Sequence, residues 1–304
     1  MRGTFSYEPR LECICGSVLA GDLPVIEKTF AWGPVRFVRC GRCASWCQSP
    51  QIVSSALAAW FDSPEYHGAA GRPGVAYVNY AADEPARRRE ARFRVHRHLG
   101  ARLGRPGRVL EVGCATGALL SVLREEGWDV AGVDLSIGFA AAARSLYDLD
   151  VAVGDLRHVD LEAAAFDAVI MLGTFAALST LHEQLLRVRS LLKPNGVFVC
   201  NFPDAASPVV RYLYRSRFWM FTPSVSCFMT VDGATRALHR AGFRVESVSP
   251  DVQRPSLFKL LSHANLRPLA RIVDLAGIGG AGVPVLLPSL KLLAARLMPT
   301  ESAG

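Results

Sequence analysis

The chain has 304 residues, half of them hydrophobic, and a net charge of +7 at neutral pH. This length suits one large domain plus a small one, with enough apolar residues for a substantial core. The basic excess, carried mostly by arginine, permits acidic or phosphate-bearing partners without requiring them. The first residues, Met1–Glu8, lack an apolar signal core, so the eight cysteines indicate thiols or metal ligands rather than disulfides. We therefore expect a cytoplasmic protein.

Two close cysteine pairs mark residues 1–50 as a separate small module. A Cys-x-Cys pair and a Cys-x-x-Cys pair are separated by 24 residues, in which short strands are expected at Thr29–Trp32 and Val35–Val38. Four thiolates suit tetrahedral zinc, and a closed site of this kind has no open position for a substrate. We expect a structural zinc ion; free thiols are the alternative, and Cys47 is a competing ligand. The four candidate ligands are Cys13, Cys15, Cys40 and Cys43.

Residues 51–107 connect this module to the remainder of the chain. A helix is expected over Ile52–Phe61, and a second one, dense in arginine, over Glu84–Leu103. The second helix is either a solvated surface or a surface that contacts the phosphate of an activated substrate. No nucleic-acid motif accompanies the arginines, so a nucleic-acid partner is not expected.

A strand, a glycine-containing turn, a helix and a second strand follow one another in the middle of the chain. The strands are expected at Val109–Val112 and Val130–Val133, and the helix at Ala118–Glu126. Asp134 closes the second strand, 21 positions after Gly113 at the start of the turn. In such folds this carboxylate accepts hydrogen bonds from ribose hydroxyls. The pattern therefore predicts a nucleoside-binding site.

The residues of the turn distinguish between nucleotides. A nicotinamide-binding turn requires Gly-x-Gly-x-x-Gly, but the corresponding positions are Gly113, Ala115 and Ala118. The pattern from Glu111 to Gly117, Glu-x-Gly-x-Ala-x-Gly, instead resembles motif I of class I S-adenosylmethionine-dependent methyltransferases.

That resemblance implies S-adenosylmethionine as the cofactor and assigns roles around it. Glu111 would lie near the amino acid end of the cofactor, and Asp134 would hold the ribose. Asp155, at the end of a third strand, would accept a hydrogen bond from the adenine amino group; a surface turn is the alternative. The full set of implied cofactor residues is Tyr80, Glu111, Gly113, Cys114, Ala115, Gly117, Asp134, Leu135, Asp155, Leu156 and Leu172.

The remaining elements complete the predicted fold. Lys193–Gly196, read as a turn before the fifth strand, resembles the same methyltransferases, and the last strand is expected at Ser289–Met298, antiparallel beside the sixth. The expected fold is therefore an α/β, doubly wound, Rossmann-like sheet of seven strands with a zinc-ribbon-like N-terminal module. Further strands are expected at Val151–Asp155, Phe166–Leu172, Val197–Asn201 and Phe243–Val248, and helices at Phe139–Tyr147, His182–Leu192, Val231–Ala241 and Leu257–Leu275.

A closer resemblance covers nearly the whole chain. The cysteine pairs, then Phe61–Tyr66, Tyr77–Tyr80 and motif I, resemble bacterial methyltransferases with an N-terminal zinc module that modify sugars or natural products. This resemblance places Tyr80 over the methionine end of the cofactor, although packing beneath the linker is the alternative. It also implies a methyltransferase domain over residues 108–304. An insertion at about 202–230 is rich in aromatic residues and arginine, so it is either a substrate cap or part of the packing.

One departure from the family concerns catalysis. Many relatives have a Glu-His pair where this chain has Ala176 and Ala177, so no catalytic residue is assigned. The expected activity is methylation of a small activated or sugar-like molecule, a class that includes phosphate-bearing and carrier-bound substrates. The alternatives are an inactive cofactor-binding scaffold and a zinc-ribbon adaptor that docks a carrier protein or nucleic acid. The uncharged run 275–290 is too short and broken for a membrane span. With the Glu-His pair missing, the candidate bases elsewhere in the sequence are His158, His182, His239, Tyr212 and Tyr214.

Overall fold

A computed structural model of the chain describes residues 4–63, 66, 84–208, 222–254 and 285–298, together with isolated positions between 257 and 282. The expectations for Tyr77, Tyr80, Tyr212 and Tyr214 lie outside these residues. So do most of the predicted helix at 257–275 and the central part of the predicted cap.

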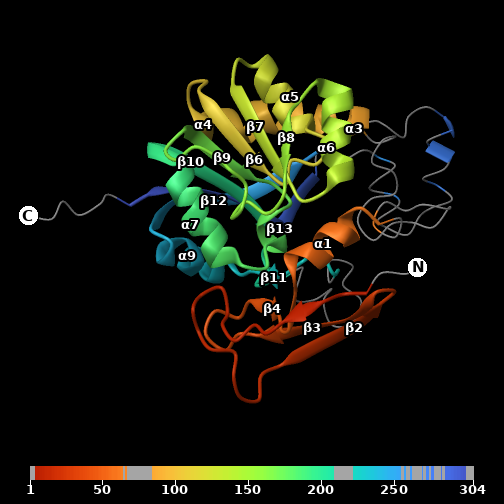
Figure 1. Ribbon diagram of the computed structural model, residues 1–304, viewed down its shortest axis with the longest axis vertical. Coiled ribbons are helices and arrows are strands. Elements are labelled where there is room, and N and C mark those ends of the chain that lie inside the picture. The colour runs from red at the N-terminus through yellow and green to blue at the C-terminus, as the bar shows by residue number, and fades with distance from the viewer. Residues whose placement is uncertain are drawn as a thin grey trace, which may run out of the picture.

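A seven-stranded sheet forms the centre of the molecule, in the order β12-β13-β10-β9-β6-β7-β8 (Figure 1). The central strands are parallel, while β13 runs antiparallel to both of its neighbours. This arrangement confirms the predicted fold class. The strands are β6 (Arg108–Val112), β7 (Asp129–Asp134), β8 (Val151–Val153), β9 (Phe166–Met171), β10 (Leu192–Pro203), β12 (Phe243–Gln253) and β13 (Val285–Leu297).

Several predicted strand boundaries are wrong. The fifth strand begins at Leu192 rather than Val197, and the predicted turn at Lys193–Gly196 is an irregularity in its pairing with β9. The last two strands are longer than predicted because they continue to pair with each other, as far as Gln253 opposite Val285. Antiparallel neighbours can extend beyond the parallel part of a sheet because each satisfies the other's backbone groups.

Helices cover both faces of the sheet. On one face, α3 (Glu84–Arg94), α4 (Gly100–Leu103) and α5 (Ala118–Glu125) share a core with β6, β9 and β10. On the other face, α7 (Leu181–Leu191) and α9 (Val231–Arg240) pack against the same strands. The single helix predicted at 84–103 changes to a π-helical segment, η1, at Val95–Leu99. No helix among the described residues is long and apolar enough to cross a membrane.

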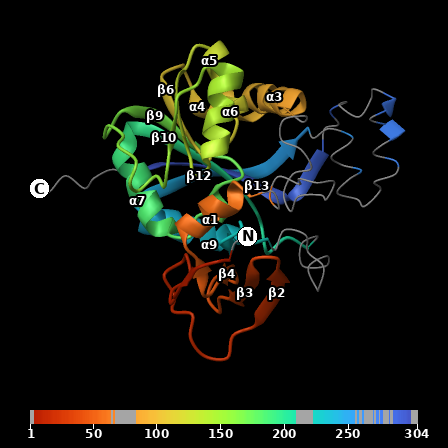
Figure 2. The same cartoon turned by 45° about the vertical axis from the view of Figure 1, so that its right-hand side comes forward.

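The N-terminal segment forms a second sheet, in the order β11-β4-β3-β2, that lies beside the large sheet (Figure 2). Its strands are β2 (Val25–Phe30), β3 (Gly33–Arg39), β4 (Trp46–Gln48) and β11 (Cys227–Phe228), so the last of them comes from about 180 residues further along the chain than β4. Two further short strands, β1 (Tyr7–Glu8) and β5 (Gln51–Ile52), pair with each other. Because Ile52 pairs with Tyr7, the next helix, α1, begins at Ser54 rather than Ile52 and extends to Phe61.

Candidate functional site

The motif I turn follows β6, and three of its residues have backbone conformations that are strained for residues other than glycine. Gly113, Ala115 and Gly117 all have positive φ, at 73°, 47° and 78°. The amide of Gly113 donates to the carbonyl of Val133, 2.7 Å away, which fixes the turn to the next strand. A Cβ atom at position 113 would overlap the Thr174 side chain. The glycine is therefore required both by its backbone conformation and by close packing.

Replacing this glycine tests the turn directly. We expect Gly113→Ala to destabilise the fold by about 1–3 kcal/mol, because alanine is strained at positive φ and must displace Thr174. Thermal unfolding measures the change. Gly173→Ala is the matched control, since Gly173 also has positive φ (75°) but has open space around its Cβ position. If Gly113→Ala lowered stability no more than Gly173→Ala does, the close contact with Thr174 would not contribute to the effect.

Asp134 joins the motif I turn to the turn after β7. One carboxylate oxygen accepts from the amide of Ala115 at 2.8 Å, and the other from the amide of Ser136 at 2.9 Å. The side chain is buried, and desolvation raises its pKa. Each oxygen still has acceptor capacity, because a carboxylate offers about four lone-pair sites. The geometry is therefore compatible with two ribose hydroxyls as further donors.

Glu111 is a buried carboxylate two residues before the turn. It is 5% exposed, and its Oε2 atom has no hydrogen-bond partner among the residues that the structure describes. Desolvation raises its pKa to about 8, although the charges of Arg87 and Arg94 oppose the shift. An unpartnered buried carboxyl group is costly, so it indicates a position prepared for a cationic or hydrogen-bond-donating ligand.

Glu84, which the sequence analysis did not single out, fixes α3 against the turn. Its two carboxylate oxygens accept from the hydroxyls of Thr116 and Tyr147, each at 2.7 Å. Burial, with the hydrogen bond to Glu84, raises the pKa of Tyr147 to about 12. The sequence does point to Glu84, because it is the acidic residue at the first position of an arginine-rich helix.

Asp155 follows β8, as predicted, but its carboxylate already has several donors from the chain. Arg157 forms an ion pair with it at 2.9 Å, Gln184 donates at 2.7 Å and Ser54 of α1 at 2.9 Å. Although burial alone would raise its pKa, these contacts lower it to about 2. An adenine amino group would have to replace one of these donors. The side chain of Leu156 is buried in the core, which leaves its backbone for a ligand.

The other predicted cofactor residues occupy supporting positions. The Cys114 side chain is buried beside Leu120 and Leu149, so only its backbone belongs to the turn. Leu135 is half-buried after Asp134, and Leu172 is half-buried at the end of β9.

A buried polar network holds the loop that follows β9. The amide of Gly173 donates to Asn201 at 2.6 Å, and the Asn201 amide group donates to Asp251 at 2.7 Å. Arg94 of α3 completes the network with an ion pair to Asp251 at 3.0 Å. This network fixes the loop after β9, which continues into the short helix η2 (Phe175–Ala177). Among the candidate histidines, His158 and His239 are exposed and His182 lies in α7.

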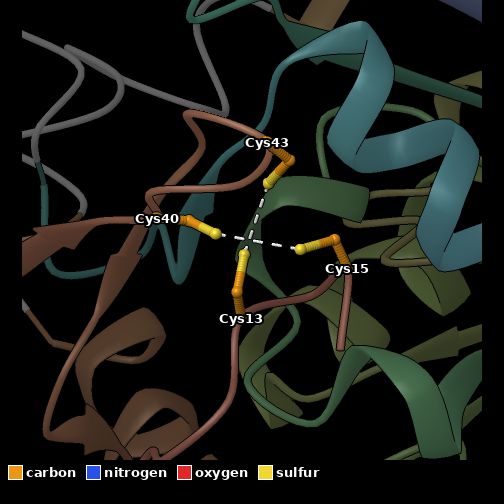
Figure 3. A group of neighbouring side chains, drawn as sticks. All are labelled: Cys13, Cys15, Cys40 and Cys43. Carbon is orange, nitrogen blue, oxygen red and sulfur yellow. Dashed lines mark hydrogen bonds between the residues drawn. The ribbon is translucent and has the colours of Figure 1, made fainter. Parts of the chain in front are cut away.

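The four predicted zinc ligands come together (Figure 3). Their sulfur atoms all lie within 4.8 Å of one another, and all four residues are buried. The sulfurs of Cys13 and Cys43 are 3.5 Å apart, and those of Cys15 and Cys40 are 3.8 Å apart. A tetrahedral zinc ion with bonds of about 2.3 Å requires sulfur separations of about 3.8 Å. The donor set and its geometry therefore fit zinc.

Cys47 lies beside this group, but its sulfur is closer to the sulfur of Cys227 than to that of Cys13. Its sulfur is 3.8 Å from Cys13 and 2.8 Å from Cys227, the residue opposite it across β4 and β11. The cysteine group is also anchored to the large domain, because the Thr230 hydroxyl at the start of α9 donates to the carbonyl of Cys43 at 2.6 Å. This hydrogen bond connects the cysteine group to the start of α9.

The sheet order, the turn at its carboxyl edge and the acids that close two strands define a nucleotide-binding α/β enzyme of the class I methyltransferase type. Comparison with known proteins agrees, because the chain belongs to the methyltransferase domain family, which matches residues 84–248. It is an S-adenosylmethionine-dependent methyltransferase.

Two curated relatives and one solved structure illustrate the similarity. The malonyl-[acyl-carrier protein] O-methyltransferase of Geobacter sulfurreducens is 31% identical over 188 residues, which is 58% of this chain and 68% of the relative. The ubiquinone biosynthesis O-methyltransferase of Roseobacter denitrificans is 31% identical over 99 residues, 31% of this chain and 40% of the relative. The fold is similar to Burkholderia thailandensis 1,6-didemethyltoxoflavin-N1-methyltransferase, with a TM-score of 0.50, 20% identity and coverage of 87% of this chain and 96% of that one.

Proposed function

We propose that the enzyme methylates an oxygen atom of a small molecule, and that this acceptor is a carboxylate or another group ionised at neutral pH. The observation that carries the proposal is the pair of alanines, Ala176 and Ala177, at the family's Glu-His position. An oxygen nucleophile that is protonated at neutral pH needs a base, whereas a carboxylate does not. The names of both curated relatives, which are O-methyltransferases, support oxygen as the acceptor.

The cofactor is proposed to lie along the carboxyl edge of β6, β7 and β8. Glu111 would receive its ammonium group, the turn from Gly113 to Gly117 would surround its amino acid part, and Asp134 would accept from the ribose hydroxyls. Asp155, with the amide of Leu156, would contact adenine after Ser54 or another donor moves aside. Leu135 and Leu172 would border the slot, and Tyr80 would cover its methionine end.

When bound, S-adenosylmethionine supplies a methyl group on a sulfonium, which is a strong leaving group. The contribution of the chain is then alignment, because near-contact geometry lowers the barrier most. The buried network from Arg94 through Asp251 and Asn201 to Gly173 is suited to this purpose, since it fixes the loop after β9, whose Thr174 contacts the motif I turn at Gly113.

A carrier-bound acyl group is the proposed form of the substrate. The Geobacter relative is named for a malonyl group on an acyl carrier protein, and a malonyl group has a free carboxylate. A sugar or natural-product intermediate is the second candidate. The two cysteine pairs ahead of motif I support it only through the resemblance drawn from the sequence, which implied a methyltransferase of this kind.

Radiolabelled S-adenosylmethionine with separate acyl-carrier, sugar and phenol acceptors distinguishes these candidates. We expect labelled product from the carboxylate acceptors, and we expect mild alkali to release the label because methyl esters hydrolyse while methyl ethers and methylamines do not. Label that resists alkali would contradict a carboxylate acceptor, and transfer to a sugar hydroxyl would establish the second candidate.

Cofactor binding should also release a proton from Glu111. Its pKa of about 8 exceeds its usual value of 4.5, so the empty folded protein holds an extra proton and loses stability as the pH rises between these values. A bound ammonium group favours the charged carboxylate, so binding at pH 7 should release up to one proton.

Calorimetry in buffers of different ionisation enthalpy measures this release with S-adenosylhomocysteine, which has the same amino acid group. Glu111→Gln should abolish the buffer dependence and weaken binding about tenfold. An unchanged buffer dependence in this variant would assign the proton to another group.

A further inference from the structure

Helix α1 lies between the N-terminal sheet and the large sheet (Figures 1 and 2). Its Leu57 and Trp60 side chains are buried in one hydrophobic cluster with Phe37 of β3. The same cluster includes Phe139, beyond β7, and Ala115 of the motif I turn packs against it. A single apolar core therefore joins α1 both to the N-terminal sheet and to the motif I turn.

The two ends of α1 make polar contacts with the turns that follow β8 and β7. Ser54, the first residue of the helix, donates to Asp155 at 2.9 Å. Asp62, the residue after the helix, accepts at Oδ1 from the hydroxyl of Ser136 and, at 3.3 Å, from the amide of Gly138. A helix of eight residues is about 12 Å long. One short helix therefore reaches both the acid proposed for adenine and the turn proposed for the ribose.

Ser136 connects Asp62 to Asp134. The amide of Ser136 donates to Asp134 at 2.9 Å, while its hydroxyl donates to Asp62 and accepts from the amide of Phe139 at 3.0 Å. This serine is completely buried and begins α6 (Ile137–Tyr147) as its N-terminal cap. A hydroxyl has one proton to donate, so the contact with Asp62 fixes its direction. Without Asp62, a buried hydroxyl would lose its acceptor beside the residue that holds Asp134.

We propose that Asp62 is a positioning residue for the cofactor, which acts through Ser136 to hold Asp134 in the orientation that accepts from the ribose hydroxyls. This role needs no contact between Asp62 and the cofactor, because its Oδ1 atom is directed at the turn after β7. The inference rests on the proposed cofactor slot. It adds to that slot a residue from outside the methyltransferase sheet, whose place is set by the packing of α1.

Calorimetry of the full-length protein with S-adenosylhomocysteine tests this role. Asp62→Ala should weaken binding about tenfold, because the Ser136 hydroxyl and the Gly138 amide lose their acceptor. Asp62→Asn keeps a side-chain oxygen that can accept both hydrogen bonds, so its affinity should lie within about threefold of the parent's. A role in general surface charge would not be rescued in this way.

A double-mutant cycle tests whether Asp62 acts through Ser136. Ser136→Ala should weaken binding to a similar extent, and Asp62→Ala/Ser136→Ala should bind within about twofold of Ser136→Ala alone. Effects that simply add would overturn the proposed connection. This comparison uses Ser136→Ala as its own reference, so it does not depend on the stability of Asp62→Ala alone.

Asp150→Ala is the matched control. Asp150 also lies outside α6 and pairs with Arg144 of that helix at 3.4 Å, but it precedes β8, at the opposite edge of the sheet from the slot. This variant should bind within about twofold of the parent. Parent-like binding by Asp62→Ala, or failure of Asp62→Asn to restore affinity, would overturn the role of Asp62 if Asp134→Ala still weakens binding. Parent-like binding by Asp134→Ala as well would contradict the proposed slot itself.

Discussion

Asp134→Ala should weaken the binding of S-adenosylhomocysteine about 100-fold or more. The substitution removes an acceptor for two ribose hydroxyls, and hydrogen bonds to charged groups contribute about 1.5–3 kcal/mol each. It also removes the acceptor that holds the amide of Ala115, so the motif I turn loses its connection to β7. Isothermal titration calorimetry measures the change in affinity.

Asp129 is the matched control for Asp134. Both acids belong to β7, but Asp129 begins the strand and its side chain is exposed, with an ion pair to Arg108 at 3.3 Å. Asp129→Ala should leave cofactor affinity within about twofold, because exposed ion pairs contribute little. If Asp134→Ala bound the cofactor as well as Asp129→Ala does, the ribose would not lie at Asp134.

Removal of one cysteine from the buried group should release the metal and destabilise the N-terminal sheet. The purified protein should contain about one equivalent of zinc, and Cys40→Ser should contain less than about 0.1 equivalent. Structural zinc stabilises small modules by several kcal/mol or more, so Cys40→Ser should lower the melting temperature by about 10 °C or more. Metal analysis and thermal unfolding measure the two effects.

Cys47 supplies the control for the zinc site. It is buried like the four ligands, but its sulfur lies closest to Cys227. Cys47→Ser should therefore keep its zinc, whereas Cys40→Ser should not. Zinc loss in both variants would place Cys47 in the ligand set, and a parent protein with less than half an equivalent would contradict the metal site.

The central part of the fold could be predicted because local signals agree there. Apolar runs predict β6 and β9, and the spacing from Gly113 to Asp134 predicts the connection from β6 to β7. Buried parallel strands have continuous apolar sequences, and the turn between them requires small residues. The cysteine group could be predicted for a similar reason, since thiolate spacing indicates metal binding before any folding is considered.

Contacts between distant segments could not be predicted in the same way. The pairing of β11 with β4 joins positions about 180 residues apart, and β11 is only two residues long. The donors to Asp155 come from Ser54, Arg157 and Gln184, and only Arg157 is close in sequence. Periodicity reports burial along one element, but it contains no information about which element supplies a partner.

Hydrogen exchange on addition of S-adenosylhomocysteine tests the cofactor slot most directly. Protection should increase in three separate stretches, at residues 111–117, 134–136 and 155–156, because the slot is built from the ends of three neighbouring strands. Saturable binding with protection elsewhere, and none in these stretches, would contradict the assignment of the slot.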